Sequence, residues 1–325
     1  MIRVVWRQQR AQLITMLAVF VVGAAALLAV RASMVSYLDG HALGNCVAIG
    51  IRADGGCGND VVQSFQDIWF DRMKVGQLFV LALPVLVGLF GGAPLFAREL
   101  EQGTHVLAFT QSVSRIRWMS SKIAVAAAPA LVVVVALQLL VEWWVGAAGK
   151  IGPLASGPYF YATFGTSGLA PVAYTLFAFS LGMFVGAASR RTLVAMTVTL
   201  AVTVVLRYAL SSLQKFLVSA QRIVSDDPSV SKVEPGSLTV FGGYLDANGN
   251  VVPNANSAVM NCGSKGDAPV TDTATCYRDH GLVKWFADVV PAEAAGTVHL
   301  VEAAIYLGLA VVLVLATGWA VRRQA

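Results

Sequence analysis

The sequence has little charge, and this scarcity excludes several classes of protein. Asp, Glu, Lys and Arg make up 13% of the 325 residues, whereas soluble domains contain roughly 25%. Hydrophobic residues instead make up 57%. A disordered chain and a coiled coil both need many more charged residues, and a soluble enzyme exposes more of them. We therefore exclude these three classes.

The sequence also lacks the motifs of common enzymes. It contains no P-loop, GxSxG, HExxH or GxGxxG pattern. Its four histidines, which are scattered along the chain, form no converging set with acids or nucleophiles; they are His41, His105, His280 and His299. We expect no catalytic residue, no metal site and no cofactor bound by this chain. The net charge is +5, but the basic residues form no patch interleaved with aromatics. We therefore expect no nucleic-acid partner.

Long apolar runs are what the sequence has in place of charge. Six runs of about 18 to 25 residues match the length that crosses a roughly 30 Å hydrocarbon core at 1.5 Å per residue. They are Leu13–Val30, Leu78–Phe96, Ile123–Ala147, Leu169–Ala188, Leu193–Leu210 and Val298–Val321. The first run is longer than the 7–15 apolar residues of a signal peptide, so we expect it to be retained. The fold class is therefore an all-α polytopic membrane protein with six transmembrane helices.

The distribution of Lys and Arg predicts the orientation. With the N-terminus in the cytoplasm, residues 1–12, 97–122, 189–192 and 322–325 lie inside and carry eleven of the 23 basic residues. The outer segments also carry eleven but are more than three times as long. Basic residues are concentrated in cytoplasmic loops of membrane proteins. Both termini are therefore expected in the cytoplasm.

The four cysteines agree with this orientation, because all of them fall in the outer loops. Disulfides persist in oxidising compartments, which favours the local pairs Cys46–Cys57 and Cys262–Cys276. Pairings between the two loops remain open. A metal site is disfavoured because neither pair has CxxC spacing and no histidine is at ligand distance in sequence.

The outer segments carry some secondary structure. The stretch Val61–Arg72 predicts a short amphipathic helix with Val61, Phe65, Ile68 and Trp69 on one face. An apolar stripe over Ser211–Ser225 predicts an extension of the fifth helix. Leu238–Leu245 and Asn250–Val252 flank an Asn-Gly turn and predict a β-hairpin.

We expect three parts in the chain. Residues 1–210 contain five transmembrane helices, the outer loop 31–77 and a cytoplasmic loop at 97–122. Residues 211–297 form an extracellular insertion. Residues 298–325 contain the sixth helix and a cytoplasmic tail.

Three residues of the kinds Asp, Glu, Lys and Arg lie within the apolar runs, at similar predicted depth. They are Glu142, Arg207 and Glu302. Such groups usually face the bundle interior and pair with one another, so we predict a pair between Arg207 and a carboxylate. A role in substrate passage and snorkelling of the side chains to the interface are the alternatives.

The cytoplasmic loop is the most informative segment. The string ARELEQGTHVLAFTQSVSRIRW covers residues 97–118, with Gly-Ala-Pro-Leu before it and Lys122 after it. It resembles the first cytoplasmic loop of type-2 ABC exporter permeases, in which an acidic residue, a Gly-Thr and a Ser-Arg follow the second helix. The N-terminal Trp6-Arg7-Gln8-Gln9-Arg10 and Glu302 resemble the actinobacterial members in particular.

The resemblance implies a function. In that family the loop forms a coupling helix that docks on a separate ABC ATPase subunit, which binds ATP and Mg²⁺. The matching residues of this sequence are Glu99, Glu101, Gly103, Thr104, Ser114, Arg115 and Trp118. The family also implies a second permease subunit, as a homodimer or heterodimer, within the bilayer of a bacterial plasma membrane.

We therefore expect the permease subunit of an exporter, with efflux of an amphipathic or lipophilic substrate. Two alternatives come from other classes. One is a membrane sensor or scaffold whose extracellular region binds a ligand, and the other is an integral membrane enzyme.

Overall fold

The computed structural model describes residues 2–51, 57–102, 115–263 and 273–323. The chain divides into two compact units. The helical unit comprises Met1–Ala155, Phe160–Ser211 and His299–Ala325, and the sheet unit comprises Ser156–Tyr159 and Ser212–Val298. Tyr159 belongs to the sheet unit, and its hydroxyl donates a hydrogen bond to the Pro291 carbonyl of the same unit at 3.0 Å.

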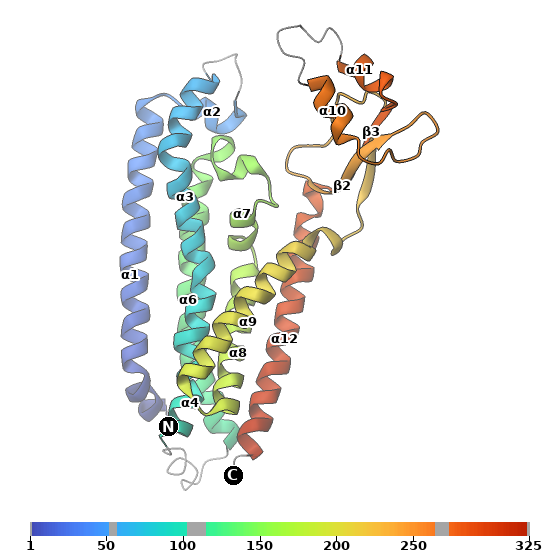
Figure 1. Ribbon diagram of the computed structural model, residues 1–325. Helices are drawn as coiled ribbons and strands as arrows, with labels where there is room; N and C mark the ends of the chain where they lie inside the picture. The colour runs from blue at the N-terminus through green and yellow to red at the C-terminus, as the bar shows by residue number, and fades with distance from the viewer. Residues whose placement is uncertain (1, 52–56, 103–114, 264–272, 324–325) are drawn as a thin grey trace. The chain divides into compact units, whose positions relative to one another are not determined.

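Six helical segments in the described part of the chain are long and apolar enough to cross a membrane, as the six runs predict. They are Leu13–Gly40, Asn59–Glu101, Arg117–Gly146, Ala170–Ser189, Thr192–Phe216 and Ala292–Arg323. The helices that build them are α1 (Ile2–Gly40), α3 (Asn59–Val87), α4 (Ala93–Glu101), α6 (Arg115–Gly146), α8 (Ala170–Ser189), α9 (Thr192–Leu213) and α12 (Ala295–Arg323). Within the helical unit, α1 begins and α12 ends at the same end of the bundle (Figure 1).

Shorter helical elements lie within or between these spans. They are α2 (Gly44–Ile49), η1 (Gly88–Gly92), η2 (Gly149–Ile151), η3 (Pro153–Ser156), α7 (Tyr161–Thr166), η4 (Gln214–Phe216), α10 (Asn256–Gly263), α11 (Thr273–Asp279) and η5 (Ala292–Ala294).

The second span corrects one prediction. Val61–Arg72 is no separate helix, because α3 runs unbroken from Asn59 to Val87. Its packed face also differs from the predicted one. Phe65 and Trp69 are buried, whereas Val61 and Ile68 are 42% and 39% exposed. Phe65 and Trp69 belong to a core cluster that includes residues of α1 and α6, and this tertiary packing selects the buried face.

Small residues let α8 approach the second span closely. A Cβ on Gly182 would lie 2.5 Å from the Gly88 carbonyl oxygen of the π-helical turn η1, and one on Gly186 would collide with the Ala93 carbonyl oxygen. Conversely, a Cβ on Gly88 would lie 2.7 Å from the Ala178 carbonyl oxygen of α8. Small residues at interfaces allow helix backbones to pack directly in membranes.

The sheet unit contains more β-structure than the predicted hairpin. Strands β1 (Gln221–Ser225), β2 (Leu238–Leu245) and β3 (Lys284–Val290) form an antiparallel sheet in the order β1-β3-β2. The predicted turn is present, since Leu245 pairs with Val251 in an isolated bridge. The helix predicted over Ser211–Ser225 is wrong beyond Phe216, because Gln221–Ser225 pairs with β3 along its whole length.

Both predicted local disulfides are present. Cys46 is bonded to Cys57 in the helical unit, and Cys262 is bonded to Cys276 in the sheet unit, with Cα–Cα separations of 5.3 and 5.8 Å. Each bond closes a short stretch of chain. The cross-loop pairings that the sequence left open are excluded.

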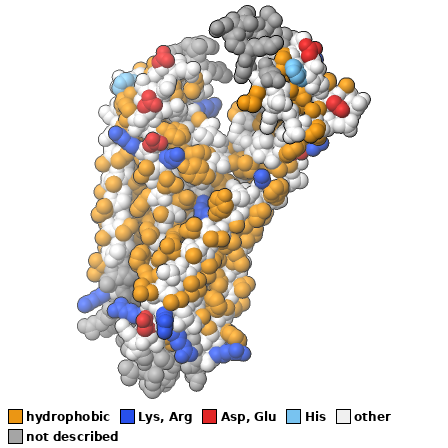
Figure 2. All heavy atoms as spheres, viewed as in Figure 1, with side chains coloured by type: hydrophobic (Ala, Val, Ile, Leu, Met, Phe, Trp, Pro, Cys, Tyr) orange, Lys and Arg blue, Asp and Glu red, His pale blue; other side chains and the backbone are white. Residues whose placement is uncertain are grey.

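Hydrophobic side chains cover much of the visible face of the helical unit between its ends, and Lys and Arg appear toward both ends (Figure 2). Many of the exposed apolar side chains lie on α1 and α9; examples are Leu17 at 61%, Leu193 at 79% and Val205 at 66%. A surface of this kind is suited to lipid.

Candidate functional site

The end of the second span is joined to α6 by an ion pair. Glu99 of α4 pairs with the Lys122 ammonium of α6. The Lys122 side chain is 4% exposed and that of Glu99 is 21% exposed. Lys122 also lies 4.4 Å from the ring centre of Trp118, which packs on Phe96 with a centroid separation of 5.6 Å. Glu99 and Trp118 are therefore part of a packed junction between α4 and α6.

The same end of α4 also holds the beginning of α9. The Glu101 carboxylate accepts hydrogen bonds from the Thr192 backbone N–H at 3.2 Å and from the Thr192 hydroxyl at 2.8 Å. Thr192 is the first residue of α9, where backbone N–H groups lack partners within the helix and the helix dipole favours a negative charge. Glu101 thus caps α9 from another helix.

Other predicted residues of the coupling loop are only partly described. Gly103, Thr104 and Ser114 lie outside the described residues. Arg115 is the first residue of α6, and its side chain is outside them too. The described junction therefore consists of the two ends of the loop: α4 with Glu99 and Glu101, and α6 with Trp118 and Lys122.

Of the three intramembrane ionisable residues, two meet around a tyrosine. The Tyr174 hydroxyl of α8 donates a hydrogen bond to the Glu302 carboxylate of α12 at 2.7 Å. The Arg207 guanidinium of α9 lies over the Tyr174 ring, 4.0 Å from its centre. Glu302 is 3% exposed, so this contact is buried. Tyr174 thus links α8, α9 and α12 in one cluster.

Glu142 has a different neighbour. Its carboxylate accepts a hydrogen bond from the Gln138 amide at 3.0 Å, one helical turn earlier in α6. The same amide nitrogen donates to the Gly168 carbonyl at 2.9 Å. The sequence prediction at this depth rests on charged residues alone and does not include Gln138. The sequence signal for this contact is the spacing of Gln138 and Glu142, because residues four apart lie on one helix face.

A comparison with protein families identifies the chain. The family model described as "ABC-2 membrane transporter related" matches residues 17–215, which is more than half of the chain. The chain belongs to this family. No curated protein and no solved structure matches it. The ABC-2 family agrees with the resemblance of the 97–118 string, and the matched region contains α4, α6 and α9.

This ABC-2 permease has a large apolar cavity between α1 and α3. Its volume is about 850 Å³, and its lining includes Val22 and Leu27 of α1 and Val75 and Phe79 of α3. Asp71 and Arg72 are the ionisable residues among the described residues of the lining. Such a lining favours the hydrocarbon part of an amphipathic molecule.

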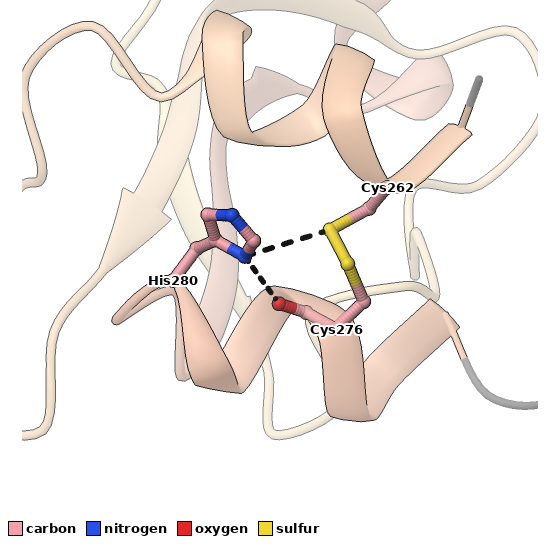
Figure 3. Close-up of side chains that lie close together, drawn as sticks. All are labelled: Cys262, Cys276 and His280. Atoms are coloured by element: carbon pink, nitrogen blue, oxygen red, sulfur yellow. Dashed lines mark hydrogen bonds between the residues drawn. A yellow bond between two sulfur atoms is a disulfide. The ribbon is translucent and has the colours of Figure 1, made fainter. Parts of the chain in front are cut away.

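The permease also brings His280 to the second disulfide (Figure 3). The His280 Nδ1 atom lies 3.8 Å from the Cys262 sulfur and 2.9 Å from the Cys276 carbonyl oxygen. The spacing in sequence predicts no histidine at ligand distance, but the helical turn at the end of α11 places His280 beside Cys276. The two sulfurs are bonded to each other, so they offer no thiolate to a metal while the disulfide is intact.

The sheet unit of the permease carries an exposed ion pair between neighbouring strands. Arg222 of β1 donates two hydrogen bonds to Asp288 of β3, at 2.7 and 2.8 Å. These hydrogen bonds hold the pKa of Asp288 below its ordinary value. The pair joins residues that face each other in the β1–β3 register.

Proposed function

We propose that this chain is the permease subunit of an ATP-driven ABC exporter in a bacterial plasma membrane. A separate ABC ATPase subunit binds ATP and Mg²⁺ and supplies the energy. The permease moves an amphipathic or lipophilic substrate outward, and two permease subunits, identical or different, enclose the pathway. The family match supports the permease role, and the resemblance of the 97–118 string supports export.

The attachment of both ends of the loop supports a coupling role for residues 99–118. Glu99 ties α4 to α6, and Glu101 ties α4 to α9. A displacement of this junction by a docked ATPase therefore acts on three spans together. In this proposal the loop between α4 and α6 carries the docking surface, while Glu99 and Glu101 transmit its movement into the bundle.

The proposed orientation has both termini and the loop in the cytoplasm, with the sheet unit and both disulfides outside. The basic residues that follow the positive-inside rule support this orientation. The disulfides support it as well, because such bonds are rare in the cytosol. The apolar cavity between α1 and α3 supports a substrate with a hydrocarbon part.

Copurification tests the proposal. The tagged chain is purified from its native membrane in mild detergent, and the preparation is assayed for ATP hydrolysis and subunit composition. We expect an ABC ATPase in stoichiometric amount, with hydrolysis that depends on Mg²⁺. A matched preparation carrying Arg115→Glu is the comparison, because the family resemblance assigns Arg115 to docking. A wild-type chain that purifies with no ATPase contradicts the proposal. The function as a sensor or scaffold would then be favoured.

A further inference from the structure

A second cavity lies within the helical unit, beside Glu142. It is formed by α3, α6, η3, α7 and the turn before α8, and its volume is about 320 Å³. A cavity of about 150 Å³ holds benzene, so this one has room for roughly ten non-hydrogen atoms. Leu154 in its lining is 44% exposed, so the cavity reaches the protein surface. A small organic molecule fits here, whereas a lipid does not.

Several hydrogen-bond donors around this cavity are engaged with the protein. The Gln77 amide nitrogen donates to the Thr163 hydroxyl at 3.2 Å. The Thr166 hydroxyl donates to the Ala162 carbonyl at 2.7 Å. The Gln138 amide nitrogen donates to two residues of the lining, to the Glu142 carboxylate and to the Gly168 carbonyl. Each of these contacts occupies a donor with an acceptor of the protein.

Acceptors, in contrast, remain available. The Gln77 carbonyl oxygen is buried and has no hydrogen-bond partner among the described residues, and the whole residue is 2% exposed. A carboxylate has about four acceptor positions, and the hydrogen bond from Gln138 fills one on Glu142. A buried acceptor without a partner costs about 1–3 kcal/mol. A ligand that donates hydrogen bonds to Gln77 removes this cost.

The charge of the lining points to the same kind of ligand. Glu142 is the one ionisable residue among the described residues that line the cavity, and Arg207 and Lys74 are not among them. Val141, Val145 and Leu154 make much of the remaining surface apolar. A carboxylate in such surroundings favours a positive partner that also makes hydrogen bonds.

We propose that this cavity binds a protonated organic amine. The ammonium group donates hydrogen bonds to the Glu142 carboxylate and the Gln77 carbonyl oxygen, and the apolar part of the ligand contacts Val141, Val145 and Leu154. An alkali metal ion suits the site less well, because it requires about six oxygen ligands, as Ca²⁺ and Mg²⁺ do, and leaves the apolar walls unused. That the amine is the exported substrate rests on the proposed function, but binding of the amine does not.

The test measures binding to the purified full-length chain in neutral detergent by titration calorimetry. The probes are 2-phenylethylammonium chloride, the neutral 2-phenylethanol of similar size, and sodium chloride. We expect saturable binding of the ammonium probe, with affinity about tenfold or more above that of the alcohol. Equal affinities, no saturable binding of the ammonium probe, or saturable binding of sodium alone each overturn the proposal.

Two variants locate the site. Glu142→Gln is nearly isosteric and should weaken binding of the ammonium probe about tenfold or more, and Gln77→Leu should weaken it several-fold. The matched control is Glu293→Gln, an exposed residue outside the cavity, which should leave the affinity unchanged. Unchanged affinity in Glu142→Gln overturns the proposal. Should that variant fail to fold, the comparison of the ammonium and alcohol probes on the wild-type chain still decides the matter.

These outcomes are independent of the ATPase. Amine binding by a chain that purifies with no ATPase keeps the site and removes the export function. A chain that purifies with an ATPase but binds no amine keeps the export function and removes the amine site.

Discussion

Glu99 of α4 forms an ion pair with Lys122 of α6, and this pair joins the two helices on either side of residues 103–114. The contact changes what Glu99 is expected to do. The resemblance to ABC permeases implies an acidic residue that docks on an ATPase, and here its carboxylate also neutralises a buried ammonium. Glu99 therefore contributes to the stability of the bundle as well as to any docking surface.

Removal of the Glu99 carboxylate tests this contribution. Glu99→Ala leaves Lys122 buried without its counter-charge, and breaking a buried pair costs about 3–5 kcal/mol. Because Glu99 is partly exposed, we expect a loss near the lower end of this range, measured as a reduced unfolding midpoint in detergent. The double variant Glu99→Met with Lys122→Met should recover much of the loss. An unchanged midpoint in Glu99→Ala would show that the pair is dispensable.

Two glycines in spanning helices offer a matched pair of substitutions. A Cβ on Gly182 would lie 2.5 Å from the Gly88 carbonyl oxygen, whereas one on Gly308 of α12 meets nothing within 4 Å. Alanine is a better helix former than glycine by about 1 kcal/mol, so Gly308→Ala should keep or raise the unfolding midpoint. Gly182→Ala should lower it. Equal midpoints would argue against direct packing of α8 on η1.

The cluster of Tyr174, Arg207 and Glu302 is tested by a double-mutant cycle. The Tyr174→Phe variant removes the hydroxyl that contacts Glu302, and the Glu302→Leu variant removes its acceptor. If the 2.7 Å hydrogen bond stabilises the bundle, the two substitutions should be non-additive by about 1 kcal/mol in unfolding free energy. Strict additivity would mean that the contact contributes nothing.

The exposed pair in the sheet unit predicts a pH dependence. Hydrogen bonds from Arg222 lower the pKa of Asp288 in the folded state, so the stabilisation is present above the unfolded pKa of about 3.9 and is lost as pH falls through the folded value. We expect Asp288→Asn to reduce hydrogen-exchange protection of the β3 amides at pH 7, after correction for intrinsic rates. The difference from wild type should shrink at pH 3. A difference independent of pH would exclude the ionised pair as its cause.

Single introduced cysteines test the orientation. The described native cysteines are all in disulfides, so an introduced cysteine supplies the thiol that reacts. Asn248→Cys in the sheet unit should react with a membrane-impermeant maleimide in intact cells, and Gln102→Cys should react only in inverted vesicles. Both positions are exposed, so the side of the membrane decides the labelling. The reversed pattern would overturn the proposed topology.

The number of spanning helices could be predicted from the sequence, and so could the two cysteine pairs that it favoured. Bilayer thickness fixes the length of an apolar run, so six runs predict six helices. The spacings from Cys46 to Cys57 and from Cys262 to Cys276 are short, and each pair lies in one loop. These features depend on composition and on the spacing of nearby residues, and both can be read directly from a sequence.

Contacts between segments far apart were less predictable. The sequence has no signal that Glu99 meets Lys122 or that Glu101 caps α9, because these contacts depend on how the helices pack. The strand β1 was expected to be helical, since its neighbours share an apolar stripe. Pairing with β3 overrides that local pattern. Gln77 was overlooked because a single amide in an apolar run gives no periodic signal.

Crosslinking from the end of α4 tests the central claim most directly. Gln102 is exposed and immediately precedes the loop that is proposed to dock on the ATPase. A photoreactive maleimide is attached to Gln102→Cys in native membranes, with Ala247→Cys in the sheet unit as the control. We predict a crosslink from Gln102→Cys to an ABC ATPase, with a yield that changes on addition of ATP, and none from Ala247→Cys. Absence of any ATPase crosslink from Gln102→Cys, or equal crosslinking from both positions, would contradict the account.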